Sequence, residues 1–141
     1  MELDECVNFL LSVSQHTVFQ HLSEKLLPYN ITPAQYGVLN CLWKEKYLTP
    51  KEIGEKLHLE ASSVSSILDK MQKNSLIERN IDPNNRRTII VSATQKAIDI
   101  QKPIEKIILE MNNLMLEPFS DTEKKFLVEA LQTIIRRNYN K

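Results

Sequence analysis

Apolar residues recur every three or four positions along most of the chain, and this spacing predicts helices. The first run predicts a helix from about residue 4 to residue 27, which ends near Pro28. Three further runs predict helices over Pro33 to about Lys44, Pro50 to about Leu57 and Ala61 to about Asn74. These three runs each have an apolar stripe, so each helix is expected to bury one face and expose the other.

Three short motifs mark where helices begin. Thr32, Thr49 and Ser120 are each followed three residues later by Gln or Glu, which is the capping-box pattern. Proline occupies the first helical position at residues 33 and 50, where a missing N–H costs nothing. The motifs therefore predict helix starts at residues 33, 50 and 121.

The apolar period changes between residues 76 and 92. Leu76–Asn80 and Thr88–Ser92 are rich in strand-forming residues and flank the turn-rich segment Asp82–Arg87, which predicts a β-hairpin. The helical period then returns, with Pro103 as a kink or break, and a last helix is expected from Asp121 to about Asn138. The chain is thus predicted to be mainly α with a small β-hairpin.

A short helix, a turn, a second helix and a hairpin, in this order, predict a winged helix-turn-helix. We expect a single domain over residues 1–141, with the winged core at about 33–93. Helices at about 4–27 and 94–138 flank this core at its N-terminal and C-terminal sides.

The flanking helices carry more apolar surface than one small domain can cover. Phe9, Val13 and Phe19 lie outside the main apolar stripe of the first helix, and residues 98–135 are rich in Ile, Leu, Met and Phe. Because a large apolar surface usually implies a partner, these helices are predicted to form a homodimer.

The helix predicted over residues 61–74 has an unusual polar face. It carries four serines, although serine is a mediocre helix former, and small hydroxyls in a major groove can reach base edges or phosphates. Two arginines on the hairpin turn are suited to the adjacent minor groove or its phosphates. The candidate DNA-binding residues are Lys51, Ser62, Ser63, Ser65, Ser66, Lys70, Arg86 and Arg87. In a two-fold dimer they predict recognition of double-stranded DNA at a pseudo-palindromic operator.

The charge balance and the low glycine content exclude several classes of function. The chain has 18 basic and 18 acidic residues, so attraction to DNA must come from a local patch. Residues 61–92 hold five basic side chains against three acidic ones, whereas residues 1–60 hold five against eight. With only two glycines there is no phosphate-binding loop, and no catalytic order of residues is present, so we expect neither an enzyme nor a cofactor.

Further signals argue against other classes of protein. No apolar run approaches the ~20 residues that span a bilayer, and the acidic residues near the N-terminus do not fit a signal peptide, so we expect a cytoplasmic protein without membrane contact. Cys6 and Cys41 form neither a metal cluster nor a disulfide framework by themselves. His16 and His21 lie off one helical face, so no metal site is predicted.

The stretch from Leu48 to Thr94 resembles the winged-helix core of the MarR family of bacterial transcription regulators. That family has a wing signature of Asp-x-Arg followed by a strand ending in Leu-Thr, and residues 85–94 here read Asn-Arg-Arg-Thr-Ile-Ile-Val-Ser-Ala-Thr. The flanking helices follow the plan of the family as well. The resemblance implies a homodimeric, sequence-specific DNA-binding regulator, a repressor released by a small-molecule effector.

Three positions depart from the family pattern. Asn85 replaces the Asp whose carboxylate would pair with the wing arginine, here Arg87, and Ala93 replaces the Leu. Ser66 stands where many relatives place an arginine, which implies a different base preference. Asp82 is expected to take the place of the missing carboxylate beside Arg87.

The resemblance also implies a crevice between the dimerisation helices and the winged core, in which a small aromatic or lipophilic effector binds. The candidate lining residues are Val13, His16, Phe19, Tyr36, Trp43 and Met111. The alternative for each of them is an ordinary place in the core.

One branch of the family senses peroxides through a cysteine near the start of the first helix. Matching Phe9–Ser14 to the Phe-Leu-Leu-Tyr-Ala-Ser segment of that branch places Asn8, not Cys6, at the sensing position, and two residues correspond to about 200° around a helix. Cys41 is expected to pack in the core. Redox sensing through Cys6 stays an alternative, as does a winged helix that binds another protein.

Overall fold

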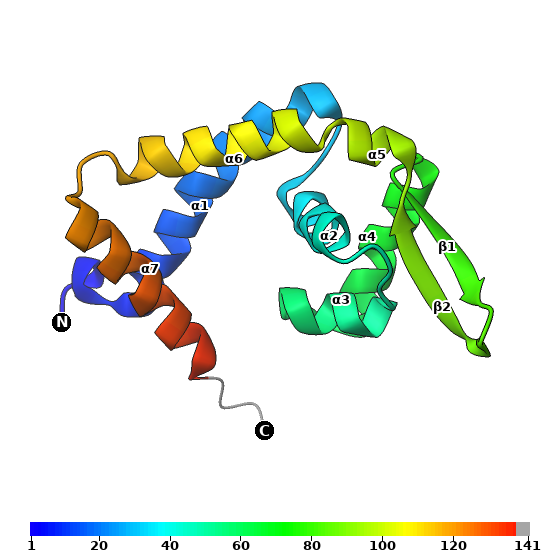
Figure 1. Cartoon of the computed structure of the whole chain (residues 1–141). Helices are drawn as coiled ribbons and strands as arrows, with labels where there is room; N and C mark the ends of the chain where they lie inside the picture. Colours follow the sequence, from blue (N-terminus) through cyan, green and yellow to red (C-terminus); the bar gives the residue numbers. More distant parts are fainter. Residues whose placement is uncertain (138–141) are drawn as a thin grey trace.

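The computed structural model of the chain describes residues 1–137. It is mainly helical with one antiparallel hairpin, as the sequence predicts (Figure 1). The elements in chain order are α1 (Val7–Leu26), α2 (Pro33–Lys44), α3 (Pro50–Leu57), α4 (Ala61–Lys73), β1 (Ile77–Asp82), β2 (Asn85–Ala93), α5 (Gln95–Asp99), α6 (Gln101–Leu116) and α7 (Asp121–Arg136). Single 3-10 turns at Leu3–Glu5 and Leu27–Tyr29 flank α1.

The capping boxes begin three helices where the sequence places them. Thr32, Thr49 and Ser120 each accept the backbone N–H of the residue three positions later, at 3.1, 3.1 and 3.2 Å between oxygen and nitrogen. The Gln or Glu at that later position accepts the backbone N–H of the capping residue in return. The predicted starts of α2, α3 and α7 are therefore confirmed.

An apolar cluster shared by α2, α3, α4 and the hairpin holds the winged core together. Val38 of α2, Ile53 of α3 and Leu68 of α4 are at most 1% exposed. Leu48, which precedes α3, exchanges backbone hydrogen bonds with Val91 of β2 at 3.2 and 2.7 Å. The loop before α3 is therefore bonded to the edge of the hairpin, which fixes the hairpin against the helices.

Some boundaries differ from the sequence prediction. α1 begins at residue 7 rather than near residue 4, because Cys6 adopts an extended conformation and precedes the helix. The helical break lies at Ile100, between α5 and α6, so Pro103 occupies the first turn of α6, where its missing N–H costs nothing. α7 ends at Arg136, and the predicted end at residue 138 lies outside the described residues.

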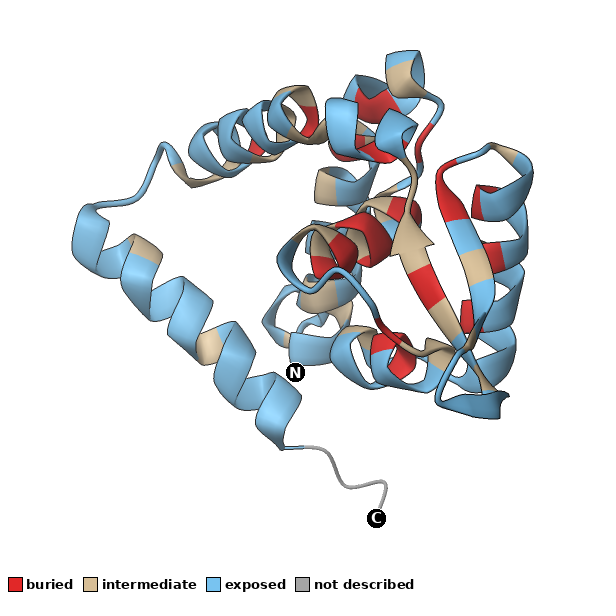
Figure 2. Ribbon diagram, turned by 45° about the vertical axis from the view of Figure 1, so that its right-hand side comes forward, coloured by how far each residue is buried: buried red, intermediate tan, exposed pale blue. Residues whose placement is uncertain are grey.

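The helices outside the winged core differ in how they are packed. α1 and α6 contact each other, and Leu26 and Ile104 on them have no exposed surface. α7 has no buried residue and stands away from the winged core, as the pale-blue helix in Figure 2 shows. Among the described residues, no helix has both the length and the apolar character that a bilayer crossing requires.

Candidate nucleic-acid interface

α4 turns one apolar face to the core and one polar face to solvent. Val64, Leu68 and Met71 recur at the helical period and are at most 2% exposed. The solvent-exposed face includes Ser62, Ser63, Ser65, Ser66 and Lys70. Because the buried stripe fixes the rotation of α4, these hydroxyls and the ammonium group are held outward, as a helix that enters a major groove requires.

A close approach of two helices sets the position of α4. A Cβ atom added at Gly54 of α3 would lie 3.0 Å from the carbonyl oxygen of Leu59 and 3.3 Å from Val64 Cγ2. His58 ends α3 in the left-handed conformation, with φ of 56°, and so turns the chain towards α4. A side chain at Gly54 would therefore require the Leu59 carbonyl or the Val64 side chain to shift by a few tenths of an ångström.

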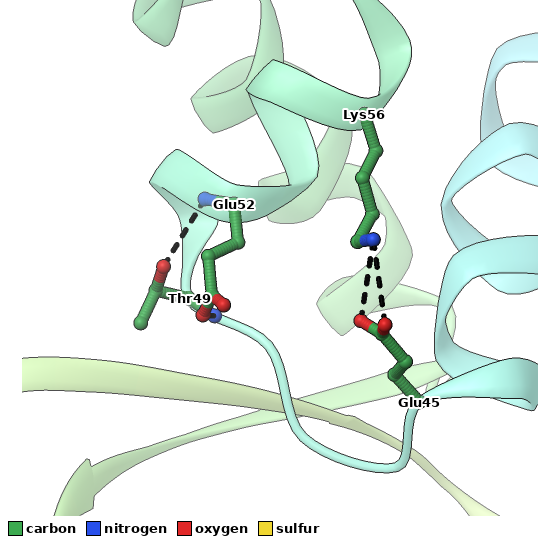
Figure 3. Close-up of polar contacts among 4 residues, drawn as sticks. All are labelled: Glu45, Thr49, Glu52 and Lys56. Atoms are coloured by element: carbon green, nitrogen blue, oxygen red, sulfur yellow. Dashed lines mark hydrogen bonds and ion pairs between the residues drawn. The ribbon is translucent and has the colours of Figure 1, made fainter.

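Polar contacts hold both ends of α3, as Figure 3 shows. Thr49 and Glu52 exchange the capping hydrogen bonds, and Lys56 Nζ lies 3.4 Å from Glu45 Oε2 at the end of α2. Hydrogen bonding to Thr49, first to its backbone and then to its side chain, lowers the pKa of the Glu52 carboxyl. Lys51, in the same first turn, is exposed to solvent, so its charge is accessible to a phosphate.

The wing is the hairpin of β1 and β2, and two side chains shape its tip. Asp82 Oδ1 accepts the backbone N–H of Asn84 at 2.9 Å, and Asn85 Oδ1 accepts that of Arg87 at 3.1 Å. Such short-range bonds from Asp and Asn are typical of tight turns. Both bonds therefore lie within the tip itself.

The expected pairing of Asp82 with Arg87 is wrong. The Asp82 carboxylate bonds to the turn instead, because a backbone N–H two residues away can be reached without ordering a long side chain. Arg86 and Arg87 are exposed, and neither takes part in an ion pair within residues 1–137. Their guanidinium groups are therefore available to phosphates.

Arg79 links the wing to α4, a contact that the sequence reading missed. Its Nε donates to Gln72 Oε1 at 2.6 Å, and its Nη2 lies 2.7 Å from Asp69 Oδ1. Strand alternation is the signal that could have found it, because Arg79 falls on the same face of β1 as the buried Ile77. The contact fixes the wing relative to the helix.

The candidate effector residues occupy three helices. Those on α1 are exposed, those on α2 are half-buried and the one on α6 is buried; in chain order they are Val13, His16, Phe19, Tyr36, Trp43 and Met111. A cavity of about 450 Å³ is lined by Phe119, Thr122, Glu123, Phe126 and Leu127. Another, of about 280 Å³, is lined by Asn40, Cys41, Lys44, Glu45, Lys56 and Leu57.

Two of these candidates do lie together on α2. The rings of Tyr36 and Trp43 are 6.4 Å apart between centroids and tilted by 58°. Trp43 Nε1 donates to the carbonyl oxygen of Ala97 at 3.1 Å, and Asn40 donates to the Tyr36 hydroxyl at 3.2 Å. Burial raises the pKa of Tyr36. The pair thus connects the winged core to α5, which leads into α6.

The two cysteines differ in their surroundings. Cys41 is buried, as predicted, and burial raises the pKa of its thiol. Cys6 is partly exposed and immediately precedes α1. Within residues 1–137 no three His, Cys, Asp or Glu side chains gather as metal ligands.

Comparison with known proteins adds to this geometry. The family model described as the MarR family matches residues 31–89. The organic hydroperoxide resistance transcriptional regulator of Bacillus subtilis (strain 168) is 30% identical over 148 aligned residues, covering 100% of this chain and 95% of the relative. The HTH-type transcriptional regulator SarZ of Staphylococcus epidermidis is 25% identical over 135 residues, covering 94% of this chain and 88% of the relative.

Solved structures share the fold. The transcriptional repressor CouR, bound to a 23-mer DNA duplex, matches with a TM-score of 0.88 and 25% identity over 95% of each chain. The PcaV transcriptional regulator from Streptomyces coelicolor, in complex with its natural ligand, matches with a TM-score of 0.89 and 20% identity over 96% of each chain. The arrangement of helices and hairpin is therefore one that proteins of known structure adopt.

Proposed function

The chain belongs to the MarR family of transcription regulators, and we propose that it is a homodimeric repressor that binds double-stranded DNA and is released by a small effector. The regulators that it resembles are not enzymes. We place its action in the cytoplasm of a bacterial cell, where DNA and small effectors meet.

One observation carries the proposal. The polar face of α4 and the tip of the wing are both exposed, and Arg79 holds these two elements in a fixed relation through Asp69 and Gln72. A helix and a hairpin presented together can enter a major groove and the minor groove beside it. A protein whose wing bound another protein would need neither hydroxyls on α4 nor unpaired guanidinium groups at the tip.

Each candidate residue has a role in this interface. We assign base contacts to the hydroxyls of α4 and phosphate contacts to the cations around them. The base-reading residues are Ser62, Ser63, Ser65 and Ser66, and the phosphate-binding residues are Lys51, Lys70, Arg86 and Arg87. Cations that bind phosphate add affinity for any duplex, whereas the serines decide which sequence is preferred.

A second copy of the chain is needed to cover the apolar surface of the outer helices. On α7, Phe126 is 70% exposed, Leu131 is 38% exposed and Ile135 is 54% exposed. A helix that packs on nothing is marginally stable in water, so this face supports a homodimer built from α1, α6 and α7. The two copies of α4 would then lie about one DNA turn apart, roughly 34 Å, on a pseudo-palindromic operator.

The candidate effector residues fit the same dimer. Val13, His16 and Phe19 of α1 are exposed in one chain, so a second copy is needed to enclose them with the aromatic pair of α2. We propose a small aromatic or lipophilic effector there, because the side chains on offer are mostly apolar and aromatic. Effector binding beside Trp43 would then be transmitted to α5 and α6 through the hydrogen bond from Trp43 to Ala97.

A peroxide response through Cys6 is the second candidate for the switch. The Bacillus subtilis relative is named for organic hydroperoxide resistance, and Cys6 is accessible at the start of α1. A hydroperoxide would oxidise the thiol to a sulfenic acid and would itself be reduced to the alcohol. Replacement of Cys6 by Ser separates this switch from effector binding, because only the peroxide response would be lost.

Selection of duplexes from a random-sequence pool on the purified protein tests the proposed function. The expected result is a pseudo-palindrome with half-sites separated by about one helical turn. Failure to enrich any sequence at low ionic strength would contradict it. A selected duplex then serves to screen phenolic compounds and organic hydroperoxides for release of the protein.

A further inference from the structure

The wing has one face that turns towards α4. Ile77 and Arg79 of β1 lie on this face, opposite Ala93 and Val91 of β2 in the cross-strand register. Ile77 is 1% exposed and Val91 is fully buried, so the face belongs to the core at the base of the hairpin. Figure 2 shows this change along the hairpin, with buried residues near its base and exposed residues at its tip.

Nearer the tip, the same face carries an exposed apolar pair. Ile81 and Ile89 are direct cross-strand partners, and their side chains are 60% and 39% exposed. Arg87 is exposed two residues before Ile89, within the stretch 86–88 that the register shift at the tip leaves without cross-strand partners. The pair lies beyond the part of the hairpin that α4 covers, so apolar surface and a guanidinium group are left open to solvent together.

The neighbouring side of α4 is polar. Arg79 bonds to Asp69 and Gln72, which identifies the side of α4 that faces the wing. Ser65 lies four residues before Asp69 and Ser62 lies seven before it, so both fall on this same side, towards the start of the helix. β1 follows the end of α4 and runs back alongside this helix, so the tip of the hairpin lies towards the start of the helix, where these serines are (Figure 1).

A helix in the major groove and a hairpin tip in the adjacent minor groove must straddle one sugar-phosphate strand. The inner face of the wing and the Ser65 side of α4 then face this DNA strand from opposite sides. The strand offers apolar deoxyribose carbons next to charged phosphates, which is the chemistry that an isoleucine pair beside an arginine complements.

We propose that Ile81 and Ile89 pack on the deoxyribose rings of this strand, at the edge of the minor groove, while Arg87 binds a phosphate next to them. The inference rests on the proposed function and adds a contact that charge alone does not supply. Apolar contact depends on the width of the minor groove, so the pair reads the shape of the operator rather than its base edges.

The test replaces both isoleucines in the full-length protein. Ile81→Thr together with Ile89→Thr keeps the β-branched shape that strands favour and removes the apolar ends of both side chains. Binding to a selected duplex is expected to weaken about tenfold per half-site, as the loss of a few buried methyl groups implies. The slope of log Kd against log salt concentration is expected to stay unchanged, because no charge is removed.

Two variants serve as controls. Ile90→Thr alters the outer face of the same strand and is expected to leave binding unchanged, and Arg87→Ala is expected to lower the salt slope. The inference is overturned if the double isoleucine variant binds as tightly as the parent, or if Ile90→Thr weakens binding equally through the fold of the hairpin. If the parent binds no duplex at all, the proposed function fails and takes this inference with it.

Discussion

Arg79 of β1 holds Asp69 of α4 with 2.7 Å between Nη2 and Oδ1, and the same guanidinium reaches Gln72 through Nε. The side chains of Arg79 and Asp69 are 27% and 60% exposed, so this ion pair lies at the surface. A pair of this kind contributes only about 0–1 kcal/mol to stability. Its consequence lies in geometry, because it fixes the angle between the wing and the helix that are proposed to enter neighbouring grooves.

We expect Arg79 and Asp69 to be coupled in DNA binding. In a double-mutant cycle of Arg79→Gln and Asp69→Asn, the coupling energy measured on a selected duplex should be about 0.5–1 kcal/mol. The full cycle is needed because Asp69→Asn alone also removes a negative charge near the DNA, which raises affinity. Fluorescence anisotropy of a labelled duplex gives the affinity of each variant.

The ion pair of Lys106 and Glu110 on α6, with 3.9 Å between nitrogen and oxygen, is the matched control. It lies outside the winged core, so replacement of its two members by Gln should show no coupling in DNA binding. Strictly additive effects of the Arg79 and Asp69 substitutions would mean that their contact does not set the wing.

The two wing arginines should act on every duplex alike. Replacement of Arg86 and Arg87 by Ala is expected to weaken binding whatever the DNA sequence, and each lost phosphate contact lowers the salt slope by about 0.9. Titrations at several salt concentrations measure this slope. Lys106→Ala on α6 serves as the control with an unchanged slope, and a double variant that kept the parent slope would rule out wing contact with phosphates.

The serines of α4 should act on sequence preference. Ser63→Ala or Ser65→Ala is expected to relax discrimination at single base pairs by about 1–3 kcal/mol, with little loss of non-specific affinity. Repeating the selection from random duplexes with each variant reveals the change, and Lys70→Ala should weaken binding without altering the motif. Recovery of the parent motif by both serine variants would show that these hydroxyls do not read bases.

The features that the sequence predicts correctly depend on neighbouring residues. A capping box is complete within four positions, so Thr32, Thr49 and Ser120 define helix starts without any knowledge of the fold. The polar face of α4 follows in the same way, because burial of Val64 and Leu68 at the helical period leaves the serines on the other side.

Contacts between elements are beyond this kind of reasoning. Strand alternation places Arg79 on the face of β1 that turns towards α4, but it does not identify Asp69, ten residues earlier on a helix, as its partner. Within the wing tip, the sequence offers Asp82 two partners, the backbone N–H of Asn84 and the side chain of Arg87. The structure shows the bond to Asn84, and sequence patterns do not distinguish the two. The effector candidates on α1 are exposed in one chain, so their assembly depends on a second copy that one sequence does not describe.

The apolar face of α7 should decide the oligomeric state. Replacement of Phe126 and Leu131 by Asp is expected to give monomers, because each buried side chain of this size contributes about 1.5–3 kcal/mol to the interface. Sedimentation equilibrium measures the mass directly. Gln132→Asp adds a charge to α7 without removing apolar surface and should stay dimeric; a dimeric Phe126/Leu131 variant would place the interface elsewhere.

The two thiols should differ in their reaction with iodoacetamide. Burial raises the pKa of Cys41 above its ordinary value, so at pH 8 less of it is thiolate, and alkylation should accelerate only as the pH rises further. Mass spectrometry of the Cys6→Ser variant follows Cys41 alone, and the Cys41→Ser variant follows Cys6. Alkylation of folded Cys41 at the rate of an unfolded thiol at pH 8 would contradict its burial.

Two copies of the chain on one duplex, bound through α4 and the wing, are the centre of the account. Analytical ultracentrifugation of the protein with a selected duplex, at about 50 mM and then about 200 mM salt, tests this most directly, since binding through the phosphate contacts of two chains should weaken about ten-thousandfold over this range. The predicted result is a complex of two chains per duplex at the lower salt concentration that dissociates at the higher one. A protein that sediments as a monomer and leaves the duplex free at the lower concentration would contradict it.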